Sequence, residues 1–430
     1  MIRVFSILAA LLVSLNAFAA GIRFEPAAPD NRSSITAHVY STWCIPMDPK
    51  VTVAGDRIDI QLVNATFAGC IAIPFFIPIE AQIGIVPPGV YRVRVLEGWA
   101  SNIVAEETLV VRDTRAMRIF PAGAPAAGGT TVELRRTTEA DWIVHPYATT
   151  TVQFGNEPPV SITPWTDWGR LLVKVPPHSP GVVDVKVTQT LDGVTTETIA
   201  RTAFTYYDPA AAPDRAVFEP LLFPVAYDGP GALGSQWTTE NWLSQGGATF
   251  FAAPCTACAT SGSERVRLDK VSAPAGVVLW PARGMFEMLG ASSRVRDLAK
   301  QADNAGAYVP LAREGDFRRA LVFPDVPNDP KYRLMLRVWS FEDPQLEGMK
   351  RVAWGAGSGI RGSIDLLTTA APGIVFGSAD ITTTLLPGTA SMEITVGQSL
   401  HRVWGILSVT NNETQQVTII APRPGVPGER

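Results

Sequence analysis

The sequence predicts an all-β protein, and three observations lead to this class. Pro and Gly are abundant, with 35 and 36 residues in a chain of 430, and both favour turns over long helices. Charged residues make up only 18% of the chain, while the strand-forming residues Val, Ile, Thr, Phe and Trp recur. Many short segments alternate apolar and polar side chains with a period of two, as half-buried strands do.

The first residues indicate export. Arg3 precedes an apolar run over 4–15, and "AFA" at 17–19 has the form of a signal-peptide cleavage site. We therefore expect a secretory signal peptide over 1–19, with a retained N-terminal anchor as the alternative. The rest of the sequence has no stretch apolar enough to span a bilayer, so we expect no membrane insertion after cleavage. The expected location is the periplasm, the cell surface or the medium of a bacterium.

Residues 20–113 carry the pattern of one immunoglobulin-like β-sandwich. A Gly-Asp pair at 55–56 predicts a turn between two strands, and Pro-Pro-Gly at 87–89 predicts a turn that leads into another. The segments that alternate as strands do are 35–43, 50–55, 57–64, 89–98 and 106–113.

Residues 115–208 contain an ordered set of motifs. Pro121 precedes Gly128-Gly129-Thr130 and a strand pattern, and "TVQFGNEPP", "RLLVKVPPHSPGVVDVKVT" and "TAFTYYD" follow in that order. The set resembles the IPT/TIG domain, an immunoglobulin-like module, although "RRTTEADWIVHP" replaces the Gly-x-x-Phe that usually follows its first strand. The resemblance implies a sandwich fold without an activity, because such modules act as spacers or binding units in surface proteins.

The same Gly-Gly-Thr could be mistaken for a phosphate-binding loop. Such loops lie between a strand and a helix and usually carry a Lys. Here a strand pattern follows, so we predict a turn.

Residues 209–215 form a short Ala/Pro linker, and 216–430 form a larger, jelly-roll-like β-sandwich region. A hairpin is predicted over 398–422, and 292–306 is the one segment that could form a short helix. This region resembles uncharacterised all-β regions of exported bacterial proteins, which implies no activity. The complete prediction is tandem immunoglobulin-like β-sandwiches followed by this larger sandwich.

Four cysteines in an exported chain predict two disulfides. Three connectivities are possible, and Cys44–Cys70 with Cys255–Cys258 keeps each bridge inside one domain. A redox or metal role for the C-x-x-C pair is less favoured. The pair precedes a strand pattern rather than a helix, and the sequence has no second C-x-x-C or nearby His.

No local motif for catalysis or metal binding appears, so we expect no enzyme activity, no metal and no cofactor. The sequence contains neither G-x-S-x-G nor S-x-x-K. Four histidines are present and none has metal-ligand spacing, so we expect them at the surface or at sheet edges: His38, His145, His178 and His401. The net charge is −4 without a basic stripe, which argues against nucleic acid as a partner.

Tryptophans offer the one binding hypothesis. Trp165 and Trp168 lie in a predicted loop, where exposed rings can stack on a sugar or anchor a protein. The alternative is that these rings cap the sandwich core. Four others follow strand patterns and are expected in the core: Trp237, Trp242, Trp339 and Trp404.

The sequence therefore predicts an exported, non-catalytic, structural or adhesive protein that binds a glycan or a protein at the cell surface or in the periplasm. The alternative is a carbohydrate-active enzyme with its site in the C-terminal sandwich, which would need two facing carboxylates in a cleft.

Overall fold

In the residues that the computed structural model describes, the elements of secondary structure are strands, apart from one 3-10 turn, η4 (Glu314–Asp316). The predicted all-β class is confirmed. No helix in this part of the chain is long and apolar enough to cross a membrane. The chain divides into two compact units, Met1–Val217 and Phe218–Arg430. The described residues are 21–40, 49–62, 78–97, 102–137, 147–162, 170–211, 213–231, 234–245, 265–267, 276–284, 289–299, 306–341, 351–356, 359–368, 374–382, 391–397 and 402–424.

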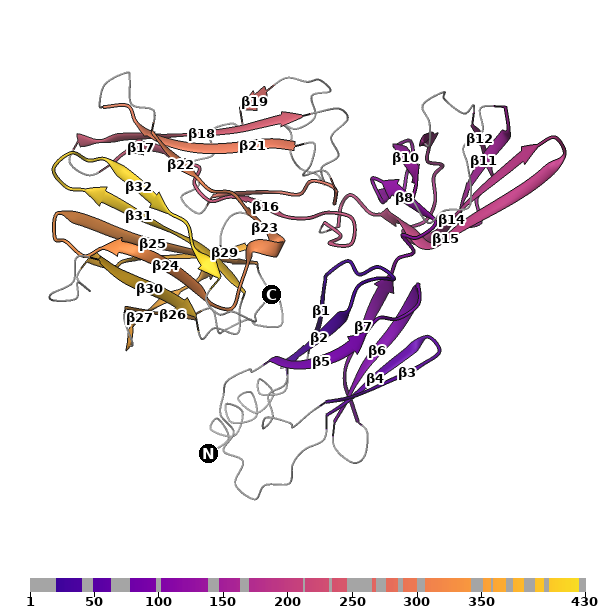
Figure 1. The fold of residues 1–430 in the computed structure, drawn as a ribbon, viewed down its shortest axis with the longest axis horizontal. Coiled ribbons are helices and arrows are strands. Elements are labelled where there is room, and N and C mark those ends of the chain that lie inside the picture. The colour runs from indigo at the N-terminus through magenta and orange to yellow at the C-terminus, as the bar shows by residue number, and fades with distance from the viewer. Residues whose placement is uncertain are drawn as a thin grey trace, which may run out of the picture. The chain divides into compact units, whose positions relative to one another are not determined.

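The first unit begins with two sheets packed around one core (Figure 1). Strand β4 (Arg57–Leu62) shows why these residues form a sandwich, because Ile58, Ile60 and Leu62 are buried and the residues between them are not. One sheet has the order β1-β2-β5, with β1 (Gly21–Glu25), β2 (Ile35–Tyr40) and β5 (Pro78–Gly84). The other has the order β3-β4-β6-β7, with β3 (Lys50–Ala54), β6 (Gly89–Glu97) and β7 (Asn102–Val111).

Two further sheets of this unit enclose a second core. The predicted turn at Gly128-Gly129 is present, and strand β10 follows it rather than a helix. Gly128 has φ +71°, and a Cβ there would lie 2.6 Å from the backbone of Pro176, so only Gly fits. The order β13-β10-β8 joins β8 (Met117–Phe120), β10 (Thr131–Arg136) and β13 (Arg170–Lys174). The order β12-β11-β14-β15-β9 joins β9 (Gly123–Pro125), β11 (Thr149–Phe154), β12 (Val160–Ile162), β14 (Gly181–Leu191) and β15 (Val194–Tyr207).

A buried arginine ties the end of β7 to the second pair of sheets. Arg112 is 6% exposed. Its Nη1 donates hydrogen bonds of 3.1 Å to the carbonyls of Ala122 and Ala203, and its Nη2 donates one of 2.6 Å to the Thr205 hydroxyl. The Thr202 hydroxyl donates in return to the carbonyl of Val111 at 2.6 Å. Hydrogen bonds from a charged group are among the stronger ones, so these contacts stabilise the junction.

A turn before β2 is hydrogen-bonded to the residues that follow Arg112. The Asp30 carboxylate accepts hydrogen bonds from the Ser33 and Thr114 hydroxyls and from the backbone N–H of Arg32. Burial raises the pKa of Asp30, but these hydrogen bonds outweigh burial and hold the pKa below its ordinary value.

The second unit contains a sandwich of two five-stranded sheets around a large apolar core. One has the order β27-β26-β30-β24-β33, with β24 (Leu321–Pro327), β26 (Arg351–Ala356), β27 (Gly359–Asp365), β30 (Ser391–Gly397) and β33 (Arg423–Pro424). The other, called the central sheet below, has the order β28-β29-β25-β31-β32, with β25 (Tyr332–Phe341), β28 (Leu367–Thr368), β29 (Ile374–Asp380), β31 (Val403–Asn411) and β32 (Val417–Ile420).

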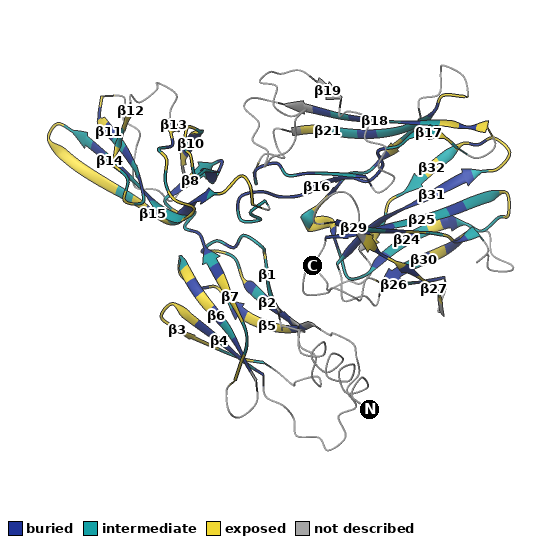
Figure 2. Ribbon diagram, turned by 180° about the vertical axis from the view of Figure 1, so that it is seen from behind, coloured by how far each residue is buried: buried dark blue, intermediate teal, exposed yellow. Residues whose placement is uncertain are grey.

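The central sheet is covered on both faces. In β31 the residues from Val403 to Thr410 are all buried, as Figure 2 shows in dark blue. Leu407 packs into the sandwich core, whereas Trp404 and Ile406 belong to a second core. An outer layer supplies the rest of this second core. It comprises β16 (Leu221–Phe223), β17 (Asp228–Pro230), β18 (Gln236–Gln245), β19 (Arg265–Arg267), β20 (Val277–Leu279), β21 (Leu289–Asp297), β22 (Ala307–Val309) and β23 (Ala312–Arg313).

Three local predictions for this unit can be compared with the structure. The hairpin predicted over 398–422 is confirmed, because β31 and β32 pair antiparallel. The possible helix over 292–306 is wrong for 292–297, because these residues belong to β21 and pair with β18. Trp339 and Trp404 are buried as expected, but Trp237 and Trp242 are only half-buried because both lie in the outer layer.

Candidate functional site

The residues that the sequence singled out as a site lie outside the described residues. Trp165 and Trp168 fall in 163–169, the segment between β12 and β13. The four cysteines of the two predicted disulfides, Cys44, Cys70, Cys255 and Cys258, lie outside them as well. Both predictions therefore stay predictions.

Two of the four histidines are described. His38 is 6% exposed and lies on the middle strand of its sheet, so its expected position at the surface or at a sheet edge is wrong. Its Nε2 is 3.1 Å from a Glu25 oxygen and its Nδ1 is 3.8 Å from Glu80. His178 stacks on Tyr206 with ring centroids 4.7 Å apart. The part of the chain that the structure describes has no group of three or more His, Cys, Asp or Glu that could hold a metal ion.

Three arginines form a row across the exposed face of the sheet β13-β10-β8. In the antiparallel register, Arg135 of β10 lies directly opposite Arg118 of β8 on one side and Arg170 of β13 on the other. All three side chains are exposed, while the alternate residues Leu134 and Leu171 point into the core. Neighbouring strands are about 4.8 Å apart, so the row places three guanidinium groups within a short span.

The rest of this sheet face adds one cation and one carboxylate. Lys174 is exposed at the end of β13, and Leu172 is exposed between it and Arg170. Glu133 forms ion pairs with Arg135 and, at 3.7 Å, with Arg170. Arg118 forms no ion pair with a carboxylate among the described residues. We call Arg118, Arg135, Arg170 and Lys174 the cationic face.

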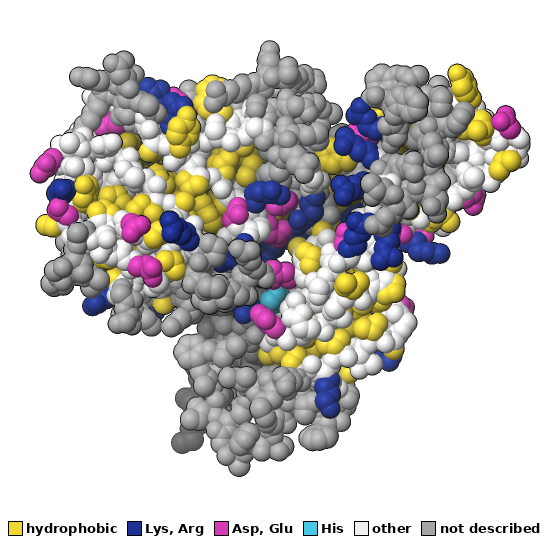
Figure 3. All heavy atoms as spheres, viewed as in Figure 1, with side chains coloured by type: hydrophobic (Ala, Val, Ile, Leu, Met, Phe, Trp, Pro, Cys, Tyr) yellow, Lys and Arg dark blue, Asp and Glu magenta, His cyan; other side chains and the backbone are white. Residues whose placement is uncertain are grey.

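The electrostatics of the cationic face favour an anionic ligand. Like charges directly opposite one another on adjacent strands destabilise a sheet, and four cations here face one carboxylate. Figure 3 shows Lys and Arg side chains gathered over the region of β8 and β10. An anion that lies along the row would relieve the repulsion between the arginines, and Arg guanidinium groups match carboxylate and sulfate-like oxygens with paired hydrogen bonds.

Sequence reasoning missed this face because the register of three strands creates it. Arg118, Arg135 and Arg170 are far apart in the chain and form no basic run. The signal that could have found it was a solvent-facing Arg in each of three predicted strands, but strand pairing was needed to align them.

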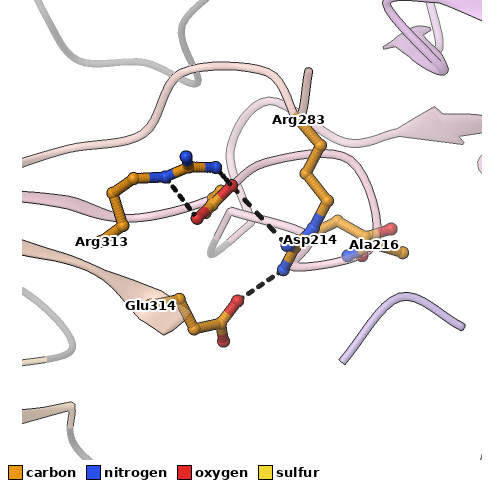
Figure 4. Close-up of polar contacts among 6 residues, drawn as sticks. Asp214, Ala216, Arg283, Arg313 and Glu314 are labelled. Atoms are coloured by element: carbon orange, nitrogen blue, oxygen red, sulfur yellow. Dashed lines mark hydrogen bonds and ion pairs between the residues drawn. The ribbon is translucent and has the colours of Figure 1, made fainter. Parts of the chain in front are cut away.

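The second unit has its own cluster of charges, which is structural. Glu219 is 7% exposed and accepts two hydrogen bonds of 3.1 Å from Arg313. Arg283 donates to Glu314 at 2.6 Å (Figure 4). These four residues link the segment before β16, the turn after β20, strand β23 and η4. Each of the two carboxylates is thus bound to an arginine.

Two adjacent cavities also lie in this unit, with volumes of about 300 and 310 Å³. They share Trp237, Val295 and Val417 in their walls. Their described lining residues include one carboxylate, Asp297, whereas glycosidases use a pair. The enzymatic alternative stays a hypothesis.

Comparisons with known proteins give no family. No protein-family model and no curated protein matches the sequence. Solved structures that match include invasin, a bacterial integrin-binding protein, at 14% identity over 72% of this chain and 60% of invasin, with a TM-score of 0.15. The chain therefore spans less than two thirds of the invasin chain. Another is the N-terminal domain of the Streptococcus gordonii adhesin Sgo0707, at 8% identity over 74% and 86% of the two chains, with a TM-score of 0.12. At these TM-scores the matches carry no functional argument.

Proposed function

We propose that the protein is an exported, non-catalytic adhesive protein that binds an anionic glycan through the cationic face. The observation that carries the proposal is the row of Arg118, Arg135 and Arg170 on three adjacent strands. Like charges that lie opposite one another on adjacent strands lower the stability of the sheet. A polyanion with charges along its length is the ligand that compensates every member of the row at once.

A glycan is favoured over other polyanions by the neighbouring sequence. Trp165 and Trp168 precede Arg170 by five and two residues, and aromatic rings stack on sugar faces. Export, which we infer from the signal peptide at 1–19, places the protein among extracellular and periplasmic polysaccharides rather than nucleic acids.

The junction at Arg112 gives the cationic face a fixed support. Arg112 is bonded to the second sandwich through three acceptors, so the first sandwich would act as a spacer that holds the binding face in one direction. The IPT/TIG interpretation of 115–208 is part of this proposal, since such modules serve as spacers or binding units.

The test is a binding titration of the mature chain, residues 20–430, against polysaccharides that differ only in charge. We expect binding to uronate- or sulfate-bearing polysaccharides and none to neutral ones at the same chain length. Arg118→Gln should weaken binding about three- to tenfold, the effect of one lost charged contact of roughly 0.7–1.4 kcal/mol.

The matched control is Arg92→Gln, which removes an exposed arginine from β6 in the first sandwich and leaves the cationic face intact. Equal losses for the two variants would remove the site assignment. A mature chain that binds no anionic polysaccharide would refute the proposed function.

A further inference from the structure

One cavity of the second unit is lined by Arg337, an arginine that has no ion-pair partner among the described residues. The cavity has a volume of about 300 Å³ and lies between the outer layer and the central sheet. This volume is at the small end of the roughly 300–1,000 Å³ that small-molecule sites occupy. The outer layer and the connection between β16 and β17 contribute apolar and aromatic side chains to its wall: Val225, Tyr227, Trp237, Val295 and Val309.

The side chains on the face of the central sheet that lies against the outer layer change from cationic to apolar along β25. In β25 every second residue lies on this face, and the order is Arg333, Met335, Arg337, Trp339 and Phe341. Trp339 and Phe341 fill the second core. The other three line the cavity instead. The face is therefore solid and apolar at one end and hollow and cationic at the other.

Polar groups gather beside the cationic end. Ser408 lies opposite Met335, and Thr410 lies opposite Arg333, so both belong to the same face of β31. Both also line the cavity. The Ser408 hydroxyl donates to the carbonyl of Met335 at 3.3 Å and keeps its lone pairs. These hydroxyls can orient a charged group that the arginine holds.

Arg337 needs an anion that the described part of the chain does not supply. Its guanidinium makes no ion pair or side-chain hydrogen bond with any described residue. Burial lowers the pKa of Arg337, but an arginine still keeps its proton at neutral pH. Asp297 lines the neighbouring cavity and forms no ion pair with Arg337. A cation in a mostly apolar cavity is costly unless an opposite charge or a set of hydrogen bonds compensates it.

We propose that this cavity binds a small organic carboxylate with an apolar body, whose carboxylate pairs with Arg337 beside Ser408 and Thr410. The planar guanidinium matches a carboxylate with two parallel hydrogen bonds. The apolar body would pack against Val295 and Val309. The cavity and the cationic face lie in different units, so this site goes beyond the adhesive function and does not depend on it.

The first test uses the wild-type mature chain and two pairs of probes: phenylacetate with phenylacetamide, and octanoate with octanamide. Each pair keeps the apolar body and removes the charge. Calorimetric titration should give at least one carboxylate bound about tenfold or more tightly than its amide, the difference expected for a charge-assisted hydrogen-bonded pair. Binding of neither carboxylate, or equal binding within each pair, would overturn the proposal.

The second test places the ligand at Arg337. Arg337→Gln should lower carboxylate affinity about tenfold or more and leave amide affinity within about twofold. Arg361→Gln, an exposed arginine on β27 outside the cavity, is the matched control and should bind as the wild type does. Far-ultraviolet circular dichroism verifies that both variants fold. Unchanged carboxylate affinity in a folded Arg337→Gln variant would contradict the assignment, and the wild-type probe pairs decide the case if that variant does not fold.

Discussion

Replacing Glu133 with Gln should destabilise the fold and strengthen polyanion binding at the same time. Glu133 is the one described carboxylate among the cations of its sheet face, and its side chain is only 16% exposed. The substitution keeps the shape of the side chain and removes the charge that Arg135 and Arg170 share. A residue with a purely structural role would lower stability without any gain in binding.

The expected loss of stability follows from the two ion pairs. Each partly exposed pair contributes about 0.2–1 kcal/mol. Repulsion between the arginines is the same in the parent and in the variant, so only the two lost ion pairs change the stability. The Glu133→Gln variant should therefore unfold with about 0.4–2 kcal/mol less free energy at low ionic strength. This difference should shrink near 1 M salt, where the Debye length is about 3 Å.

The expected gain in binding follows from the net charge of the face. Four cations and one carboxylate give +3, and the variant has +4. One further charge should raise the affinity for a sulfated or uronate-bearing polysaccharide about threefold to tenfold at low salt. Urea unfolding and a binding titration on the same sample measure both effects.

Glu106→Gln is the control, since Glu106 pairs with Arg92 at 2.8 Å on another sheet. It should leave polysaccharide affinity nearly unchanged. The reasoning is refuted if Glu133→Gln binds the polysaccharide as weakly as the wild type does, or more weakly.

Three more outcomes follow from the buried polar contacts. Arg112→Met should cost about 2–5 kcal/mol of unfolding free energy, because it leaves buried acceptors unpaired, and should speed proteolysis near residue 112. Arg115→Met, at an exposed position, is its control, and equal effects would contradict the junction. Glu219→Gln should lower the free energy of unfolding in urea by about 2–4 kcal/mol, because Glu219 is buried and bound to arginine. The control is Asp365→Asn at an exposed position, which should lower it far less. Similar losses for the two variants would show that burial is not the cause. The pKa of Asp30 lies below its ordinary value of 3.8, so its stabilisation is complete above pH 3.8 and is lost as the pH falls below it. Asp30→Asn should therefore be less stable than the parent at pH 7 and approach it near pH 2, and a constant difference in urea midpoint at all pH values would argue against this.

The sequence predicts the fold class well because half-buried strands leave a local signal. The alternation of Ile58 and Ile60 with polar residues in β4 and the Gly128-Gly129 turn are visible without any tertiary information. The sequence allows a helix over 292–306 because Leu298, Ala299 and Lys300 favour helices locally. These residues follow β21, and pairing with β18 makes the preceding residues 292–297 a strand.

The candidate sites depend on pairings that one sequence does not display. The outer layer of the second unit could have been suspected from β31, whose first five residues, 403–407, are apolar or Gly without alternation and so indicate burial on both faces. The row of Arg118, Arg135 and Arg170 needs the register of three strands, and the setting of Arg337 needs the packing of two sheets. Solvent-facing arginines in separate strands look ordinary until these pairings bring them together.

The most direct test of the cationic face is the salt dependence of polysaccharide binding. The logarithm of the affinity should fall linearly with the logarithm of the salt concentration, because binding releases counterions. The slope should become shallower by roughly one unit for each Gln substituted at Arg118, Arg135 or Arg170, and should be unchanged by Arg92→Gln. A slope near zero in the wild type, or a slope that these three substitutions leave unaltered, would contradict the account.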